Sequence, residues 1–190
     1  MKKNLIIAFR LTLVMIVLCS VLYPLMIAAI GKMSPGAGKG VKIKVNDRVV
    51  GYELIGQKFT EDKYFWGRPS AVDYNAAGSG GSNKGPSNPD YLKIVQDRID
   101  SFLVHNPGVN KTDIPADLVT ASGSGLDPDI SPTAAYIQVN RIAAARDLTE
   151  EKVKALVDQH ITAPLAGVLG PSKVNVLKLN IALDELKRKE

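Results

Sequence analysis

The segment LTLVMIVLCSVLYPLMIAAI, residues 11–30, decides the class of this protein, because it contains 20 consecutive residues without a charge. A helix rises about 1.5 Å per residue, so the segment is about 30 Å long as a helix, which matches the hydrocarbon core of a bilayer. Pro24 predicts a kink in its second half, and Arg10 lies where its side chain can reach the lipid headgroups. We therefore expect a single transmembrane helix over residues 11–30, in contact with membrane lipid, after a short N-terminal tail, residues 1–10.

A cleaved signal peptide is the alternative interpretation of the same segment. Lys2 and Lys3 would form its charged start. However, the apolar stretch is longer than a usual signal core, and the sequence Ala28-Ala29-Ile30-Gly31 is a poor cleavage site. A retained membrane span is therefore favoured.

Charge and cysteine content exclude several classes of protein. The chain has 24 Lys+Arg and 19 Asp+Glu, and residues 31–190 carry 21 and 19 of these. A nucleic-acid-binding surface needs a clustered basic face, so we expect no nucleic-acid partner. The single cysteine, Cys19, excludes an internal disulfide and any site built from several cysteines.

The positive charges near the span leave its orientation open. Three basic residues precede the span, and five follow it within the next 20 positions, namely Lys32, Lys39, Lys42, Lys44 and Arg48. A simple count would place the large domain inside the cell. Long domains, however, are translocated largely regardless of charge, so this count alone does not decide the topology.

The first half of the domain is predicted to begin with strands. Residues 31–40 form a Gly/Pro/Ser linker, and a single domain follows over residues 41–190. Alternating apolar residues predict a strand near residues 41–45 and a second over residues 48–55, joined by a tight turn. The aromatic segment 59–66 is expected to pack onto this hairpin.

Helices dominate the second half. Good capping residues predict helix starts at four positions. The first predicted helix begins after Asn88 and ends at His105, and the second begins after Ser131 and ends at Arg146. The third and fourth begin after Thr149 and Asn175. Two irregular Gly/Ser loops, residues 67–89 and 114–129, separate the earlier elements. The apolar face of the first helix contains Leu92, Val95, Ile99, Phe102 and Leu103, and that of the third contains Val153, Leu156 and Val157. Strands followed by about four helices predict an α+β domain with a small sheet.

No known catalytic motif is complete in this sequence. Phosphate-binding loops and the Gly-x-Ser-x-Gly nucleophile turn are absent. His105 and His160 lie 55 positions apart at the ends of separate helices, where a role at the helix terminus is favoured over a metal or catalytic pair. We therefore expect no catalytic and no metal-binding residue.

The unusual loop sequences carry a resemblance to a known family. The motifs are Gly67-Arg68-Pro69-Ser70-Ala71, Tyr74-Asn75, Ser79-Gly80-Gly81-Ser82-Asn83, Gly85-Pro86-Ser87-Asn88-Pro89, the run from Pro115 to Pro128, Ile130-Ser131-Pro132, then Gln138, Arg141, Ala145 and Arg146, and finally Asn175-Val176-Leu177. In this order, and over essentially the whole chain, the sequence closely resembles the C subunits of Kdp-type potassium-transporting ATPases.

The resemblance implies a subunit without catalytic activity in an ATP-driven potassium uptake pump. The expected partners are a channel-like subunit that conducts potassium, a P-type ATPase subunit that hydrolyses ATP, and a small single-span subunit. The family's C subunit is described as a catalytic chaperone that raises the ATP affinity of the pump subunit. We therefore expect no cofactor of its own, with ATP acting through the complex. The family places the N-terminus in the cytoplasm and the domain outside it, at the cell membrane.

Two groups of residues are candidates for contact with nucleotide or with the pump. Ser79, Gly80 and Gly81 resemble the signature loop of ABC transporters over three residues, although an ordinary flexible or interface loop is the favoured interpretation. Gln138 projects from the middle of the apolar face of the helix predicted over residues 131–146, with Arg141 at its border. A structural hydrogen bond to a Gly/Ser loop is favoured for Gln138, and a regulatory contact made with Arg141 is the alternative. A membrane-anchored enzyme or a binding module unrelated to a pump is the alternative function.

Overall fold

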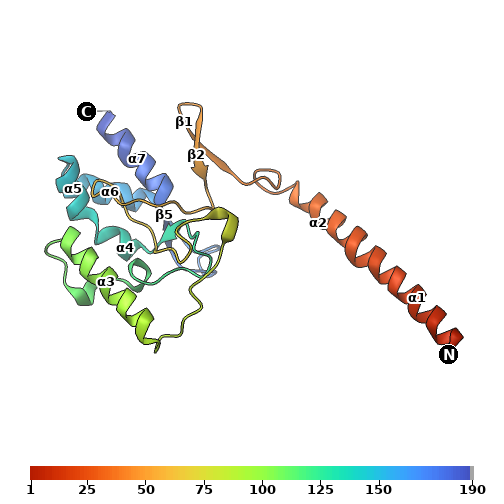
Figure 1. The fold of residues 1–190 in the computed structure, drawn as a ribbon. Coiled ribbons are helices and arrows are strands. Elements are labelled where there is room, and N and C mark those ends of the chain that lie inside the picture. Colours follow the sequence, from red (N-terminus) through yellow and green to blue (C-terminus); the bar gives the residue numbers. More distant parts are fainter. Residues whose placement is uncertain (189–190) are drawn as a thin grey trace. The chain divides into compact units, whose positions relative to one another are not determined.

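The computed structural model describes residues 1–188, so residues 189 and 190 of the predicted domain lie outside the described residues. The chain forms two separate compact units, one over residues 1–42 and one from residue 43 onward. Figure 1 shows the helices of the first unit in red and orange and the elements of the second in later colours.

The first unit contains one continuous helix. It consists of α1 (Lys2–Ile16), a wider π-helical turn (Val17–Leu22) and α2 (Tyr23–Gly31), and the most apolar window has a mean hydropathy of 2.7. The helix is long and apolar enough to cross a membrane, and it extends further toward the N-terminus than the predicted span. The wide turn ends two residues before Pro24, which has no N–H to donate, and the N–H of the intervening Tyr23 bonds to the carbonyl of Leu18.

The second unit begins with the predicted hairpin. Strands β1 (Lys42–Val45) and β2 (Arg48–Tyr52) form their own two-stranded sheet, and β2 ends three residues before the predicted end. Asn46 and Asp47 connect them with φ values of 49° and 62°, which is the left-handed conformation that a tight hairpin turn requires.

A second small sheet joins distant parts of the chain. It contains β3 (Asp129–Ile130), β4 (Ile161–Thr162) and β5 (Lys173–Asn175) in the order β3-β5-β4, with both neighbours antiparallel to β5. Ile130 and Ile161 both pair with Val174. Strands of two or three residues are too short to show an alternating pattern, so the sequence did not predict them.

Four of the helices that the structure describes in the domain start where the capping residues predict, and a further one begins after Gln138. They are α3 (Pro89–His105), α4 (Pro132–Tyr136), α5 (Val139–Arg146), α6 (Glu150–His160) and α7 (Val176–Arg188), with short 3-10 turns at Ala76–Gly78, Lys111–Asp113 and Ala116–Leu118. The side chains of all four predicted caps accept a hydrogen bond from the first helical turn, at 3.0 Å for Asn88, 3.1 Å for Ser131, 3.4 Å for Thr149 and 3.0 Å for Asn175. The α+β prediction is confirmed.

The single helix predicted over residues 131–146 is in fact two helices. The break lies at residues 137–138, where the main-chain N–H of Gln138 bonds to Ala135, three residues back, at 3.1 Å. The side-chain amide of Gln138 donates instead to the carbonyl of Ala134 at 2.9 Å. The side chain thus takes the carbonyl that the main-chain N–H uses in a regular α-helix.

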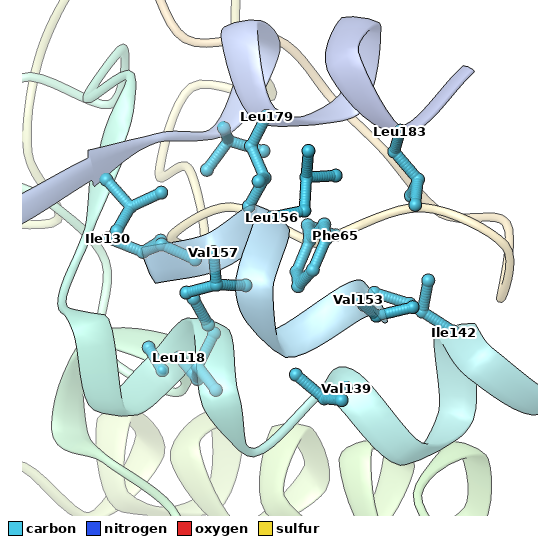
Figure 2. Packing of buried hydrophobic residues seen from close by; sticks show 14 of the residues in the cluster. Phe65, Leu118, Ile130, Val139, Ile142, Val153, Leu156, Val157, Leu179 and Leu183 are labelled. Carbon is cyan, nitrogen blue, oxygen red and sulfur yellow. The ribbon is translucent and has the colours of Figure 1, made fainter. Parts of the chain in front are cut away.

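The aromatic segment 59–66 packs into the helical core, and the prediction that it packs onto the hairpin is wrong. Figure 2 shows the Phe65 ring among side chains of α5, α6 and α7. The cluster is completed by a set of aliphatic residues that includes Ile130, Ile142, Val153, Leu156, Val157, Leu179 and Leu183. The stripe predicted for α6 is fully buried, whereas only Phe102 of the stripe predicted for α3 is buried.

Candidate functional site

Gln138 lies at the centre of the domain and is fully enclosed by protein, with an exposed fraction of 0%. Its Oε1 accepts a hydrogen bond from the main-chain N–H of Trp66 at 2.8 Å, and its Nε2 donates to the carbonyl of Trp66 at 3.2 Å. Both main-chain polar groups of Trp66 are therefore held by one side chain. The structural interpretation of Gln138 is supported, but its partner is the aromatic segment and not a Gly/Ser loop.

Arg141 contacts Gln138 and the same aromatic segment. Its Nη2 donates to Gln138 Oε1 at 2.8 Å, and its Nη1 donates to the carbonyls of Asp62 and Tyr64. The guanidinium lies 4.5 Å from the centre of the Trp66 ring, as in a cation–π contact. Burial lowers the pKa of Arg141 to about 10, and the Asp62 carboxylate opposes this shift. Arg141 therefore remains charged at neutral pH, and its hydrogen bonds are directed into the fold.

Arg146 and Asn180 also bind the main chain of the aromatic segment. Arg146 Nε donates to the carbonyl of Lys63 at 2.6 Å, and its Nη2 contacts Asp184 of α7 at 2.7 Å. The side-chain amide of Asn180 bonds to both main-chain polar groups of Phe65, at 2.8 and 3.0 Å. Buried side chains of α5 and α7, together with Gln138, thus bind every carbonyl of residues 62–66, and we call these five residues the clamped segment.

The second group of predicted site residues lies elsewhere, in contact with the other Gly/Ser loop. Ser79 Oγ and the N–H of Gly80 both donate to the carbonyl of Ser124, each at 2.9 Å. A β-carbon added to Gly81 would lie 3.0 Å from the carbonyl oxygen of Gly123. The glycines therefore allow two backbones to approach closely, which accounts for them without a nucleotide.

A cleft of about 550 Å³ lies beside the clamped segment. One wall is a face of α3, and the other comes from the first Gly/Ser loop and the residues before it; the lining includes Phe59, Trp66, Pro69, Tyr74, Ile94, Asp97, Ser101 and Phe102. Burial raises the pKa of Tyr74 to about 12, with Asp127 and Asp73 contributing, and the Tyr74 hydroxyl donates to the carbonyl of Arg68 at 2.5 Å. The cleft has the size and the aromatic lining of a binding site.

Most charged groups around the cleft already have partners. Lys58 and Asp73 form an ion pair at 2.7 Å, and His105 Nδ1 lies 2.8 Å from Asp62. Arg98 donates to the carbonyl of Val119 at 3.0 Å. The remaining carboxylate of the lining, Asp97, has no hydrogen bond or ion pair within residues 1–188. Among the described lining residues, no side-chain hydroxyl is hydrogen-bonded to a histidine or a carboxylate, and Lys58 and Arg98 already have partners.

The two histidines do not form a pair. The ring of His105 contacts Asp62 and Trp66, whereas His160 Nδ1 lies 2.8 Å from the carbonyl of Leu156 in its own helix. Within the described part of the chain, no group of three or more His, Cys, Asp or Glu residues is placed to hold a metal ion. The helix-terminus interpretation of His160 is confirmed, because its ring caps the last turn of α6.

Sequence reasoning missed the role of Asn180 and of the clamped segment. Asn180 lies on the buried face of α7 together with Val176, Leu179 and Leu183. A polar residue in the middle of an apolar stripe was the available signal, and the same signal identified Gln138. Its partner could not be predicted, because Phe65 lies 115 positions away in the sequence.

These features define a class of protein with one apolar helix able to cross a membrane and a separate α+β domain whose buried polar side chains hold its own backbone. The chain belongs to the KdpC family, described as the K+-transporting ATPase c chain, whose family model matches residues 5–185. It is therefore a subunit of a potassium-transporting ATPase, and the family resemblance inferred from the sequence is confirmed.

Individual relatives match over nearly their full length. The Potassium-transporting ATPase KdpC subunit of Flavobacterium psychrophilum is 62% identical over 97% of this chain and 100% of its own length. The subunit of the same name from Flavobacterium johnsoniae is 60% identical with the same coverage. The one from Caldanaerobacter subterraneus subsp. tengcongensis is 51% identical over 94% of each chain.

Proposed function

We propose that this chain is an accessory subunit without catalytic activity, which assembles and stabilises the potassium pump and raises the ATP affinity of its P-type ATPase subunit. Its partners are that subunit, the channel-like potassium-conducting subunit and the small single-span subunit. The observation that carries the proposal is a contrast between interior and surface. Buried polar side chains bind the protein's own backbone, while a hydrogen-bonded loop leaves large apolar side chains exposed.

The apolar loop, which we define as residues 163–170, supports a role in assembly. Leu165, Val168 and Leu169 are 73%, 80% and 63% exposed, and residues 161–172 contain no charge. The loop is not loose, because Leu165 and Leu169 exchange two main-chain hydrogen bonds of 3.0 Å. Exposed aliphatic side chains on a fixed turn are favourable only where another apolar surface covers them.

An effect on ATP affinity is best explained by conformational coupling. In the topology that we propose, residues 1–10 are cytoplasmic and the domain is extracytoplasmic, whereas ATP is in the cytoplasm. Gln138 and Arg141 are enclosed by the domain, with exposed fractions of 0% and 7%, so they act on the fold and not on a nucleotide. A subunit that binds one pump conformation more tightly raises the apparent affinity for every ligand of that conformation.

A comparison of pump complexes purified with and without this chain tests the proposal. We expect the ATP concentration for half-maximal potassium-stimulated ATPase activity to be several-fold lower when the chain is present, in line with typical coupling energies of about 1 kcal/mol or more. The purified chain alone should not hydrolyse ATP above a heat-denatured control. An unchanged ATP dependence of an intact complex would refute the chaperone role, and failure to co-purify with the two large subunits would refute assembly.

A further inference from the structure

The cations that follow the membrane helix have no role in the function proposed above. Lys32, Lys39, Lys42, Lys44 and Arg48 are accompanied by one acidic residue, Asp47, up to residue 52. We call these five cations the juxtamembrane basic segment. Such a density of positive charge next to a span is a feature that requires its own explanation, because it is not needed for the domain fold.

The basic segment is electrostatically unpaired. None of its five side chains forms a hydrogen bond or an ion pair with any residue that the structure describes, and all five are exposed. Lysines later in the domain behave differently. Lys58 pairs with Asp73 at 2.7 Å, and Lys173 pairs with Asp129 at 2.6 Å. The positive field of the basic segment is therefore available to a partner outside the chain.

The hairpin that carries three of these cations is also apolar on its surface. Lys42 and Lys44 alternate with Ile43 and Val45 along β1. On β2, exposed fractions are 48% for Val49, 38% for Val50 and 38% for Tyr52. Lysine and arginine beside aliphatic residues and a tyrosine are the composition of surfaces that lie in the headgroup region of a bilayer.

The hairpin is rigidly presented by the domain. Its turn is the tight two-residue type, and Gln57 Nε2 bonds to the carbonyl of Val50 at 2.8 Å. A β-carbon on Gly51 would lie 2.7 Å from Leu177 Cδ2 of α7, so β2 sits directly on the domain. The two strands form a ribbon distinct from the three-stranded sheet (Figure 1). Binding therefore requires little ordering of the chain.

The linker limits how far the hairpin can lie from the end of the apolar helix. Residues 32–41 connect the apolar helix to β1, and ten residues reach at most about 35 Å when fully extended. A tethered site experiences its target at a high effective concentration. Each cation near an anionic membrane contributes about fivefold in affinity, so a few unpaired cations are sufficient for stable contact.

We propose that the β1–β2 hairpin binds the anionic phospholipid surface next to the chain's own membrane span. The basic side chains contact lipid phosphates, and the apolar side chains of β2 lie among the headgroups. This contact orients the domain before and during assembly of the pump. It does not depend on the pump function, because it requires only lipid and this chain.

A spin label on the hairpin tests the proposal in the full-length chain, reconstituted in nanodiscs of phosphatidylcholine alone or mixed with phosphatidylglycerol. The label is placed at Val49→Cys, with Cys19→Ser removing the only native cysteine. We expect higher accessibility to oxygen and lower accessibility to a water-soluble nickel complex in the anionic nanodiscs. The difference should disappear at high salt, which screens charges over a few ångströms.

A triple variant and a matched control complete the test. Lys42→Gln, Lys44→Gln and Arg48→Gln together should reduce the ratio of lipid-bound to free hairpin by on the order of a hundredfold. Lys84→Gln, Lys93→Gln and Lys111→Gln change the net charge equally on other exposed parts of the domain and should have no effect. Equal accessibility in both lipid mixtures overturns the proposal. Protection that appears only in the assembled pump, whatever the lipid charge, also overturns it and assigns the hairpin to a protein partner.

Discussion

Gln138 binds Trp66 through both of the main-chain polar groups of Trp66, with hydrogen bonds of 2.8 and 3.2 Å. A side-chain amide here does what a neighbouring strand does in a β-sheet, since it offers one acceptor and one donor to an extended backbone. Asn180 does the same for Phe65. The clamped segment therefore enters the core without belonging to a sheet, and side chains of α5, α7 and the turn residue Gln138 satisfy its buried carbonyls.

Removal of the Gln138 side chain should destabilise the domain. Gln138→Ala leaves the main chain of Trp66 and one N–H of Arg141 without their partner, at a cost of about 2 to 4 kcal/mol. For a protein of this size we expect an apparent Tm lowered by on the order of 10 °C, measured on the detergent-solubilised full chain. Asn140→Ala, on the exposed side of α5, loses only a surface hydrogen bond to Glu150 and should change the Tm little. A normal Tm for Gln138→Ala would show that the residue is not structural, which would favour its regulatory interpretation.

The contact between the two Gly/Ser loops should depend on Gly125. Its φ of +68° is unfavourable for other residues, and an added β-carbon would lie 2.6 Å from Val72 and 2.8 Å from the carbonyl oxygen of Gly80. Gly125→Ala should therefore cost about 2 kcal/mol or more, visible as a lower apparent Tm. Gly123→Ala is the matched control, because no atom lies within 4 Å of its added β-carbon. Similar Tm values for the two variants would contradict close packing of these loops.

Alkaline pH should destabilise the domain through Tyr74. The folded pKa of Tyr74 is about 12, raised first by burial, against 10 in the unfolded chain. The unfolded state therefore loses this proton first, so stability that is fully present below pH 10 is lost between pH 10 and pH 12. Because the side chain is partly exposed, we expect about 1 to 2 kcal/mol over this range. Tyr74→Phe should show a shallower loss of Tm with pH, and an identical pH profile would argue against this assignment.

Assembly should depend on the apolar loop. Val168→Lys places a charge where we propose that a partner covers the surface, and recovery of this chain with the pump subunits should fall at least tenfold. The apparent Tm of the chain itself should not change, because Val168 is 80% exposed. Val104→Lys on α3 is the control, since Val104 is 78% exposed in a different part of the domain. Equal losses from both variants would mean that the loop has no special role.

Surface labelling should place the domain outside the cytoplasm. In a Cys19→Ser background, Ser82→Cys provides one thiol in the exposed part of the first Gly/Ser loop. A membrane-impermeant maleimide should label it in intact spheroplasts. A thiol at Lys3→Cys should react only after the membrane is ruptured. The reverse pattern would invert the proposed topology.

Local features were predictable because their signals lie within a few residues. The apolar run over residues 11–30, the four capping residues and the Asn46-Asp47 turn each act on neighbouring backbone groups. The α+β class and the family also followed from the sequence, since the loop motifs are long and ordered. Gln138 was identifiable as a buried polar residue from the apolar face around it.

Only the tertiary structure decided which distant residues these features contact. Gln138 and Trp66 are 72 positions apart, and no local pattern connects an amide on one helix to an extended segment so far away. The break before α5 has the same origin, because the Gln138 side chain takes a helix carbonyl while it holds Trp66. Strands β3 and β4, which pair with β5, are likewise too short to be predicted without knowledge of their partners. The sequence by itself determined the apolar N-terminal helix, the four capped helix starts and the family, whereas long-range hydrogen bonds decided how residues 62–66 are held in the domain core.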